Sequence, residues 1–456
     1  MKLLRQSSGN ITEGVIWRQL LLFFFPLWFG TFFQQLYNTV DSIVVGQFVG
    51  TTAYAAVGST GVVVNLTVGL FTGVASGAVV VIAQHFGGRR GEEVHKSVHT
   101  AMFLAIILGA VFTVVGFALT PWALEAMKTP AEALPDAILY LRICFLGMIP
   151  NVVYNMGTGV LRAIGDSRRP LYFLIAASLC NIVLDLVLIL VVGMKVEGVA
   201  IATVASQVLA AGLVVYSLCR SEGEFYQFFP KQMKLHGGEV SAMLKVGAPA
   251  ALQSLMYSSS NIVIQSAINS FGTITVAAWT AYGKMDVLFW MSLNAMSLSL
   301  TTFAGQNYGA GKYERLKKSV KVSVGMMTGF TLVLSVLMVV FARPILSVFN
   351  PDPAVLDIGV GMVRFLAPFY ITYILVELLP GAIRGAGKSF VPMVISVFGV
   401  CILRFIWLFT VVPVSHTVNT VAASYPITWI ITSIAIVIYY RWGKWLEPQP
   451  ETLSKV

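Results

Sequence analysis

Charged residues are scarce in this chain of 456 residues. Asp, Glu, Lys and Arg make up 11% of it, whereas soluble domains carry about 25%. Hydrophobic residues account for 57% of the sequence. This composition excludes an ordinary soluble domain and predicts an all-α protein that crosses the lipid bilayer several times.

The sequence also lacks the patterns of a redox site, a metal centre or an enzyme. The four cysteines are scattered without CxxC spacing, which excludes a disulfide framework and is typical of buried apolar side chains. The segment "AIRGAGKS" (382–389) has Ala382 where a phosphate-binding loop needs glycine, and His95 and His99 do not form an HExxH pattern. We therefore expect neither enzymatic activity nor a cofactor.

What the sequence does contain is a series of long apolar runs. A membrane-spanning helix needs about 20 such residues. We predict twelve spans, at 20–45, 54–82, 98–120, 138–160, 171–192, 198–218, 246–270, 276–303, 320–342, 355–382, 390–412 and 420–440.

Basic residues gather on one side of the predicted membrane. Loops such as "GGRRGEEVHKS" and "GAGKYERLKKS" alternate with turns such as "GQFVGTT", which contain no basic residue. The opposite side holds only Lys128 and Lys195, with Arg142, Arg343 and Arg364 near helix ends. The positive-inside rule therefore predicts a multi-pass protein of the cell membrane with both termini in the cytoplasm. The net charge of +10 is a topology signal, and no nucleic-acid partner is expected.

The two halves of the chain resemble each other. "QHFGGRRGEEVHKSV" from Gln84 matches "QNYGAGKYERLKKSV" from Gln306, and the same shift of 222 residues superposes Arg162 on Arg384. Because six spans per half is an even number, both halves enter the membrane from the same side. This predicts two six-helix bundles related by a parallel pseudo-two-fold axis, with the substrate path between them. The expected parts are an N-terminal bundle (1–218, with 1–19 as a cytoplasmic tail), a cytoplasmic linker (219–245), a C-terminal bundle (246–440) and a cytoplasmic tail (441–456).

Four polar side chains of the first half fall at a similar depth. At 1.5 Å per residue, Asp41, Asp185 and Thr203 lie about 6, 10 and 8 Å inside the outer ends of their helices. Asn181 lies one helical turn from Asp185. Such oxygen ligands suit a hard monovalent cation, and two acids in a low-dielectric site suit a proton equally well. We predict that Asp41, Asn181, Asp185 and Thr203 bind the coupling ion, H⁺ or Na⁺, with Na⁺ held by the first three.

The repeat supports a specific role for these groups. At the corresponding positions the second half carries Val263, Leu403 and Trp407 in place of Asp41, Asn181 and Asp185. The fold can therefore be built without polar groups there. The alternative is that hydrogen bonds between helices satisfy each group separately.

The second half has its own membrane charges. Glu377 mirrors Asn155 and has no visible partner, which makes it a candidate for attracting a cationic substrate. Opposite charges at similar depth predict that Asp286 pairs with Arg404 or Lys284. The candidate residues for a substrate cavity are Gln34, Tyr37, Asn38, Asn155, Tyr373 and Glu377.

The order of these motifs resembles a known family. "FPLWFGTFFQQLYNTVDSIVVG" in the first span, "NIVLDLVLI" in the fifth, and the repeated patterns Q-x-[FY]-G and R-x-x-G resemble the multidrug and toxic compound extrusion (MATE) family over about 15–440. The resemblance implies a pair of six-helix bundles that exports organic cations in exchange for H⁺ or Na⁺. In one branch of that family the ion site lies in the N-terminal bundle and matches Asp41, Asn181, Asp185 and Thr203 here. Another branch carries acids in helices 7 and 10, whereas helix 7 has none here and the helix 10 position holds Tyr373.

We therefore expect a monomeric, secondary active exporter of small amphipathic organic cations, driven by antiport of H⁺ or Na⁺ through alternating access. The alternative hypothesis is a flippase for a lipid-linked oligosaccharide or another lipid-like substrate. A flippase needs a basic cavity for phosphate. Here the membrane region has as many acids as bases outside the N-terminal cluster and an excess of acids within it. A scaffold or receptor without transport does not account for an acid cluster confined to one half.

Overall fold

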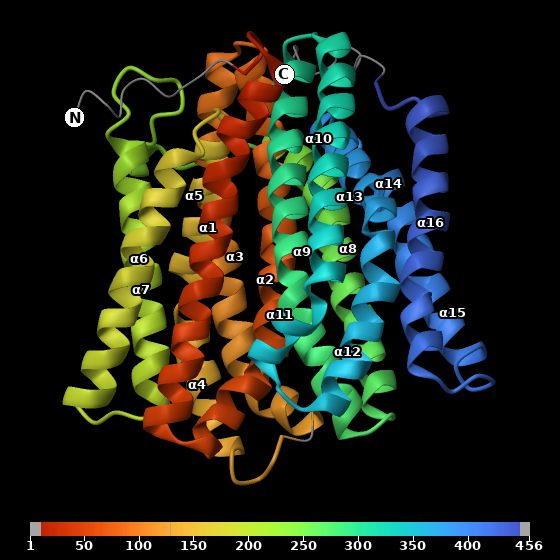
Figure 1. Ribbon diagram of the computed structural model, residues 1–456. Helices are drawn as coiled ribbons and strands as arrows, with labels where there is room; N and C mark the ends of the chain where they lie inside the picture. The colour runs from red at the N-terminus through yellow and green to blue at the C-terminus, as the bar shows by residue number, and fades with distance from the viewer. Residues whose placement is uncertain (1–10, 128, 447–456) are drawn as a thin grey trace. The chain divides into compact units, whose positions relative to one another are not determined.

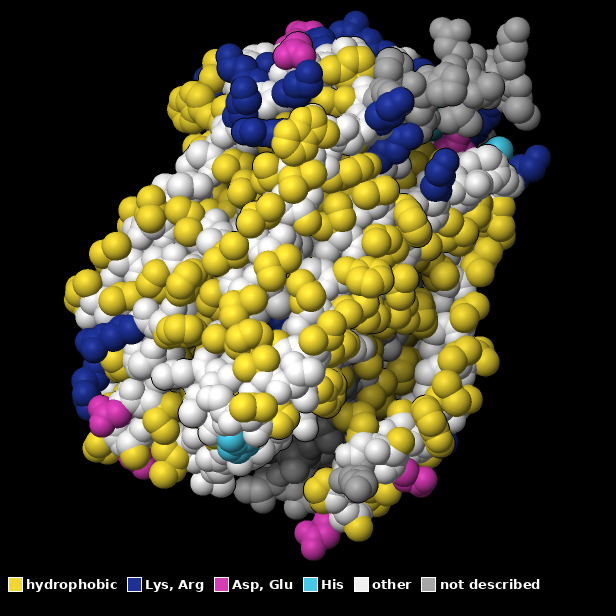
Figure 2. All heavy atoms as spheres, turned by 90° about the vertical axis from the view of Figure 1, so that its right-hand side faces the viewer, with side chains coloured by type: hydrophobic (Ala, Val, Ile, Leu, Met, Phe, Trp, Pro, Cys, Tyr) yellow, Lys and Arg dark blue, Asp and Glu magenta, His cyan; other side chains and the backbone are white. Residues whose placement is uncertain are grey.

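All secondary-structure elements among the residues that the structure describes are helices. The structure is a computed structural model, and it describes residues 11–127 and 129–446 (Figure 1). The outermost parts of both expected tails (1–10 and 447–456) and Lys128 lie outside the described residues. On the face shown in Figure 2, most Lys and Arg side chains gather at one end, next to a broad band of hydrophobic side chains.

Ten of the described helices are long and apolar enough to cross a membrane, or eleven if the pair α4 and α5, which is bent by 48°, forms one span. The expected span 246–270 lies in α8 (Gly237–Asn269), a helix of 33 residues whose middle, "SLMYSSSN", is too polar to be recognised by composition. The prediction of a helical membrane protein is confirmed, and the difference from twelve spans lies in α8.

The chain divides into two compact units. In its described part, unit 1 comprises Leu22–Ala251, and unit 2 comprises Ile11–Leu21 and the residues from Leu252 onward. Unit 1 contains most of α1 (Ile16–Val44), η2 (Val45–Val49), α2 (Thr51–Gly87), α3 (Gly91–Ala126), α4 (Leu134–Leu146), α5 (Met148–Ala163), α6 (Arg168–Leu186), η3 (Val187–Val191), α7 (Val196–Cys219), η4 (Pro230–Gln232) and the start of α8. Unit 2 contains the rest of α8, α9 (Thr273–Gly309), α10 (Tyr313–Val340), α11 (Ala342–Phe349), α12 (Pro353–Leu366), η5 (Ala367–Phe369), α13 (Tyr370–Gly385), α14 (Phe390–Ser396), η6 (Val397–Ile402), α15 (Leu403–Thr410) and α16 (Val418–Trp442).

The first helix of each half begins in the unit formed by the other half. Ile16 and Leu20, at the start of α1, pack against Phe303 of α9 in unit 2. The start of α8, up to Ala251, belongs to unit 1 in the same way. The unit boundaries therefore fall inside two helices, and α8 begins at Gly237, within the segment 219–245 that was expected to be a linker.

Small residues let α8 approach α2 closely within unit 1. A Cβ atom added to Gly73 would lie 2.3 Å from the Cα of Ala251, and one added to Gly77 would lie 2.1 Å from the carbonyl oxygen of Met243. Gly247 meets the backbone of α2 in the same way. Gly73 and Gly77, like Gly247 and Ala251, are four residues apart, which is the small-xxx-small spacing of closely packed membrane helices.

The connection between α7 and α8 is held against α3. The backbone N–H of Phe229 donates to Nε2 of His99 at 3.0 Å, and the N–H of His236 donates to Oγ1 of Thr100 at 3.3 Å. The carboxylate of Glu239 accepts a hydrogen bond from Ser97 and lies 3.4 Å from Nε2 of His85. These contacts order the connection on the side of unit 1 where α2 ends and α3 begins.

Replacing Glu239 with glutamine should therefore destabilise unit 1. Burial alone would raise the pKa of Glu239, but the hydrogen bonds from His85 and Ser97 outweigh it and leave that pKa below its usual value. Such a carboxylate stabilises the fold above its unfolded pKa of about 4.3, and this contribution is lost as the pH falls through the lower folded value. We expect Glu239→Gln to cost about 1–3 kcal/mol at pH 7. The difference from the wild type should shrink in acid.

Thermal unfolding in detergent at pH 7 and pH 4 measures this effect. Glu92→Gln is the matched control, because Glu92 is exposed and pairs with Lys96 in the next helical turn. A Glu239→Gln midpoint equal to that of the control at pH 7 would show that the connection does not depend on this carboxylate.

Candidate functional site

Asp41 and Asp185 each lie just before a change in helix geometry. Asp41 is near the end of α1, four residues before the π-helical segment η2, and Asp185 is two residues before the π-helical segment η3. Segments η2 and η3 contact each other, and both contact α7. π-Helical turns of this kind are frequent at functional sites. The polar groups predicted from depth therefore lie on elements that meet at one end of unit 1.

The structure brings the carboxyl groups of Asp41 and Asp185 together. The two groups interact directly with each other. Asp185 is fully buried, Asp41 is half-buried, and Asn181 is buried one turn away on α6. Aliphatic side chains of η2, η3 and α7 form the surrounding core, including Val45, Ile189 and Val199.

Three of the four oxygens of this pair have no hydrogen-bond partner among the described residues. Oδ1 of Asp41 and both carboxylate oxygens of Asp185 are buried without a partner, and so are both side-chain atoms of Asn181. Buried polar groups are nearly always hydrogen-bonded, and each exception needs an explanation. A proton or a cation between the carboxylates would supply the missing interaction, and Oδ1 of Asn181 could add a neutral ligand.

The fourth predicted ion ligand is Thr203. It lies half-buried on α7, and its hydroxyl donates to the backbone oxygen of Val199 at 3.0 Å. Within the described part of the chain no hydrogen bond joins Thr203 to Asp41, Asn181 or Asp185. Its oxygen keeps lone pairs that could accept a bond or bind a cation.

Two further side chains near Asp41 were not found from the sequence. Tyr140 and Cys144 of α4 interact with each other and lie within electrostatic range of Asp41. Their spacing of four residues places them on one helix face. That spacing is the only signal in the sequence, and it does not separate them from ordinary core residues.

The candidate cavity residues divide between the units. In unit 1, Tyr37 interacts with Gln34 and Asp41, and Nδ2 of Asn155 donates to Oδ1 of Asn151 at 2.8 Å. Asn38 is exposed on α1. In unit 2, Ser297 donates to Oε1 of Glu377 at 2.9 Å, and Tyr373 packs against Trp290 and Trp429.

Asp286 forms no ion pair with Arg404 or Lys284. The prediction of such a pair, made from their similar depth, is therefore wrong. Nε1 of Trp290 donates to Oδ2 of Asp286 at 2.5 Å, and the hydroxyl of Tyr370 is a second partner. Lys284 lies two residues before Asp286, and residues two apart on a helix do not share a face. Asp286 is buried, and Lys284 is therefore exposed.

Arg404 is held by other groups. Its guanidinium lies 4.2 Å from the ring centroid of Tyr425 and donates to Ser260 and Thr428 at 3.4 and 3.5 Å. Tyr425 interacts electrostatically with both Arg404 and Asp286. Aromatic side chains therefore take the place of the predicted salt bridge.

Comparison with known proteins identifies the family. The MatE family pattern matches residues 26–187 and again 249–410, one match in each half. "Probable multidrug resistance protein YpnP" of Bacillus subtilis (strain 168) is 26% identical over 445 residues, which is 96% of this chain and 98% of that protein. "Probable multidrug resistance protein YoeA" of the same organism is 29% identical and covers 84% of each chain.

A solved structure has the same fold. "Crystal structure of MATE in the bent conformation" superposes with a TM-score of 0.89 at 22% identity, over 96% of this chain and 97% of that one. Together with the duplicated family match, this confirms the predicted fold of two repeats. The chain is a multi-pass membrane transporter, not an enzyme, and it belongs to the MatE family.

Proposed function

We propose that this chain exports small, amphipathic organic cations in exchange for H⁺ or Na⁺ bound at Asp41 and Asp185. The observation that supports this proposal is the carboxylate pair in which three buried oxygens have no hydrogen-bond partner among the described residues. Two like charges in a medium of low dielectric constant cannot both persist without a bound cation or proton. Asn181 and Thr203 would supply neutral oxygens to a bound Na⁺.

Coupling requires that the ion binds one conformation more tightly than the other. Neutralising the carboxylates removes the repulsion between α1 and α6, so the packing of the two helices differs between the occupied and empty states. Segments η2 and η3 begin four and two residues after Asp41 and Asp185. We propose that these π-helical turns take up the change by shifting between π- and α-helical geometry.

The substrate side of the proposal rests on the acidic and aromatic groups of both units. Glu377 and Tyr373 would attract and stack against a cation, and Gln34, Tyr37, Asn38 and Asn155 would offer polar contacts. The names of YpnP and YoeA, probable multidrug resistance proteins, support drug-like substrates.

The arrangement in the cell follows from charge. By the positive-inside rule, the basic loops support a cytoplasmic location for both termini, and we propose that a single chain is the transporting unit. Its moving parts would be the bundles 1–218 and 246–440, joined by 219–245.

Transport in proteoliposomes tests the proposal. Vesicles with this chain are loaded with a fluorescent organic cation, and an outward flux is measured with a pH gradient alone or a Na⁺ gradient alone. One of the two gradients should drive dye movement above the rate of empty vesicles. If neither gradient moves the dye, cation-coupled export is wrong; if a labelled lipid moves instead, the chain is a flippase.

A further inference from the structure

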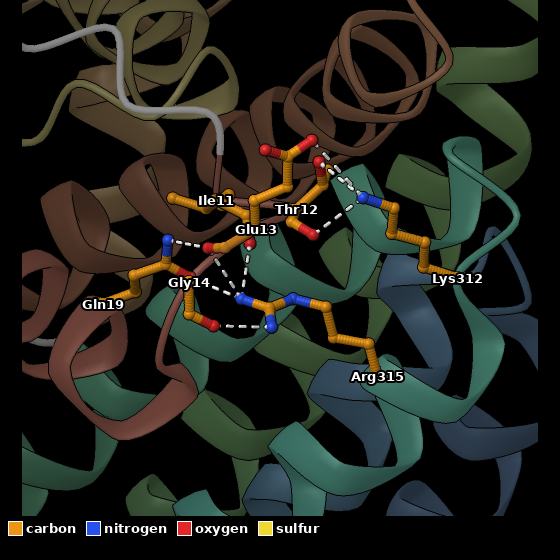
Figure 3. A network of polar contacts seen from close by, with 7 residues as sticks. All are labelled: Ile11, Thr12, Glu13, Gly14, Gln19, Lys312 and Arg315. Carbon is orange, nitrogen blue, oxygen red and sulfur yellow. Dashed lines mark hydrogen bonds and ion pairs between the residues drawn. The ribbon is translucent and has the colours of Figure 1, made fainter.

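A chain segment ahead of α1 is fastened to the start of α10 within unit 2. Figure 3 shows Lys312 and Arg315 reaching towards residues 11–19. Nζ of Lys312 donates to the backbone oxygen of Thr12 at 3.0 Å and lies 3.8 Å from the carboxylate of Glu13. The N-terminal segment is thus ordered by basic side chains, before the apolar part of α1 begins.

Arg315 is held rigidly, and the one carboxylate near it, that of Glu13, is shared with Lys312, so the two cations keep an excess of positive charge. Its guanidinium donates to neutral oxygens at 2.7–3.3 Å, namely the backbone carbonyls of Ile11, Glu13 and Gly14 and the side-chain carbonyl of Gln19. Its Nε has no hydrogen-bond partner among the described residues. A fixed guanidinium with neutral acceptors is a preorganised positive charge.

A cavity of about 500 Å³ opens beside this arginine. Its apolar wall is formed by Val15, just before α1, by Ile16 and Trp17 at the start of α1, and by Val322 of α10. Trp17 and Val15 are more than half exposed, whereas Ile16 is buried against Leu20 and Phe303. Tryptophan is the residue typical of the boundary between lipid and water.

The rim of the cavity carries net positive charge. Arg315 and Lys318 line it, and within the described residues Lys318 has no ion-pair partner. Glu314 also lines it, but Nζ of Lys317 lies 2.9 Å from the Glu314 carboxylate and balances it. A cavity lined by both cationic and apolar side chains fits a molecule with an anionic head and a hydrocarbon tail.

We propose that this cavity binds the headgroup of an anionic phospholipid. The phosphate would lie against Arg315 and Lys318, and the upper part of an acyl chain would lie along Trp17 and Val322. Basic pockets next to membrane helices are typical sites for anionic headgroups. A free phosphate ion would make no use of the exposed apolar wall, which favours a lipid as the occupant.

A bound lipid would link the start of α1 to α10. Both walls of the cavity belong to unit 2, but α1 continues into unit 1 after Leu21. Lipid occupancy should therefore strengthen the attachment of α1 to unit 2. This role concerns regulation by the membrane and goes beyond the proposed ion exchange.

Lipid titration of the purified full chain tests the site. We expect phosphatidylglycerol to raise the thermal unfolding midpoint more than phosphatidylcholine with the same acyl chains, and native mass spectrometry should show it retained. Lys318→Gln should weaken phosphatidylglycerol binding about fivefold, the effect of one basic residue near an anionic lipid. Lys321→Gln is the matched control, because Lys321 is an exposed lysine of the same helix outside the cavity.

Four outcomes would overturn the proposal. Equal losses in Lys318→Gln and Lys321→Gln would show diffuse attraction to the helix surface. Equal effects of the two lipids would remove the need for an anionic head. The same midpoint shift with inorganic phosphate would show a site for free anions. Finally, Trp17→Ala should weaken lipid binding, and an effect no larger than that of Trp122→Ala, at an exposed tryptophan outside the cavity, would exclude the acyl contact.

Discussion

Replacing Asp185 with asparagine should abolish ion-driven dye export. In alkaline buffer without Na⁺, the same replacement should raise the thermal unfolding midpoint. The carboxamide has the same shape as the carboxylate but binds no coupling cation, so the two conformations lose their difference in ion affinity. We expect the driven flux to fall by about two orders of magnitude, to the level of empty vesicles. The measurement is the dye flux in proteoliposomes under the gradient that drives the wild type.

The expected gain in stability follows from the unpartnered oxygens. In the wild type, both carboxylate oxygens of Asp185 and Oδ1 of Asp41 lack donors. The new amide group can donate to Asp41, and one buried negative charge disappears. In alkaline buffer without Na⁺, where both ions are scarce, the Asp185→Asn midpoint should exceed that of the wild type, by about 1–3 kcal/mol in free energy. A lower midpoint would mean that the acid has a structural role instead.

Asp41→Asn and a distant control complete the test. Asp41→Asn should also abolish driven flux, because either amide can donate to the remaining carboxylate and hold it without an ion. Asp357→Asn removes an exposed acid whose partner is Arg343 at 2.9 Å, and transport should be unchanged. Normal flux in both site variants would rule out the proposed coupling site.

The sequence predicted those features of the fold that depend on local composition or on duplication. Long apolar runs require helices in a membrane, and the shift of 222 residues anticipated that the family pattern matches both halves. Asp41 and Asp185 were found together because depth along a helix follows from its rise per residue. Depth does not give the rotation of a helix about its axis. The sequence therefore predicts that the two acids lie at a similar depth, but it cannot show that their side chains face each other.

The same limit explains what the sequence did not predict. Asp286 and Arg404 lie at similar depth, but Arg404 lies over the ring of Tyr425, Asp286 accepts a hydrogen bond from Trp290, and no salt bridge joins the two. Tyr140 and Cys144 of α4 gave no signal, because apolar helices carry many such residues. The attachment of residues 11–21 to unit 2 depends on contacts with Lys312 and Arg315, some 300 residues later in the chain. No local pattern encodes a contact at that separation.

Adding a single methyl group at Gly77 should disrupt unit 1. The Cβ atom of Gly77→Ala would lie 2.1 Å from the carbonyl oxygen of Met243 and 2.7 Å from the backbone nitrogen of Gly247. Both neighbours are backbone atoms of α8, so no rotamer change can relieve the overlap, and the helices must separate. Overpacking typically costs about 1–3 kcal/mol, and a clash with backbone should reach or exceed the upper end of that range.

Gly61→Ala is the control in the same helix, because no atom lies within 4 Å of its added Cβ. Alanine is the better helix former by about 1 kcal/mol, so this variant should be as stable as the wild type or more so. Size-exclusion profiles and thermal midpoints in detergent compare the two. If Gly77→Ala keeps the wild-type midpoint, α2 and α8 do not pack at this distance. If Gly77→Ala lowers the midpoint as expected, the start of α8 is an integral part of unit 1, because a loosely attached segment would move aside without loss of stability.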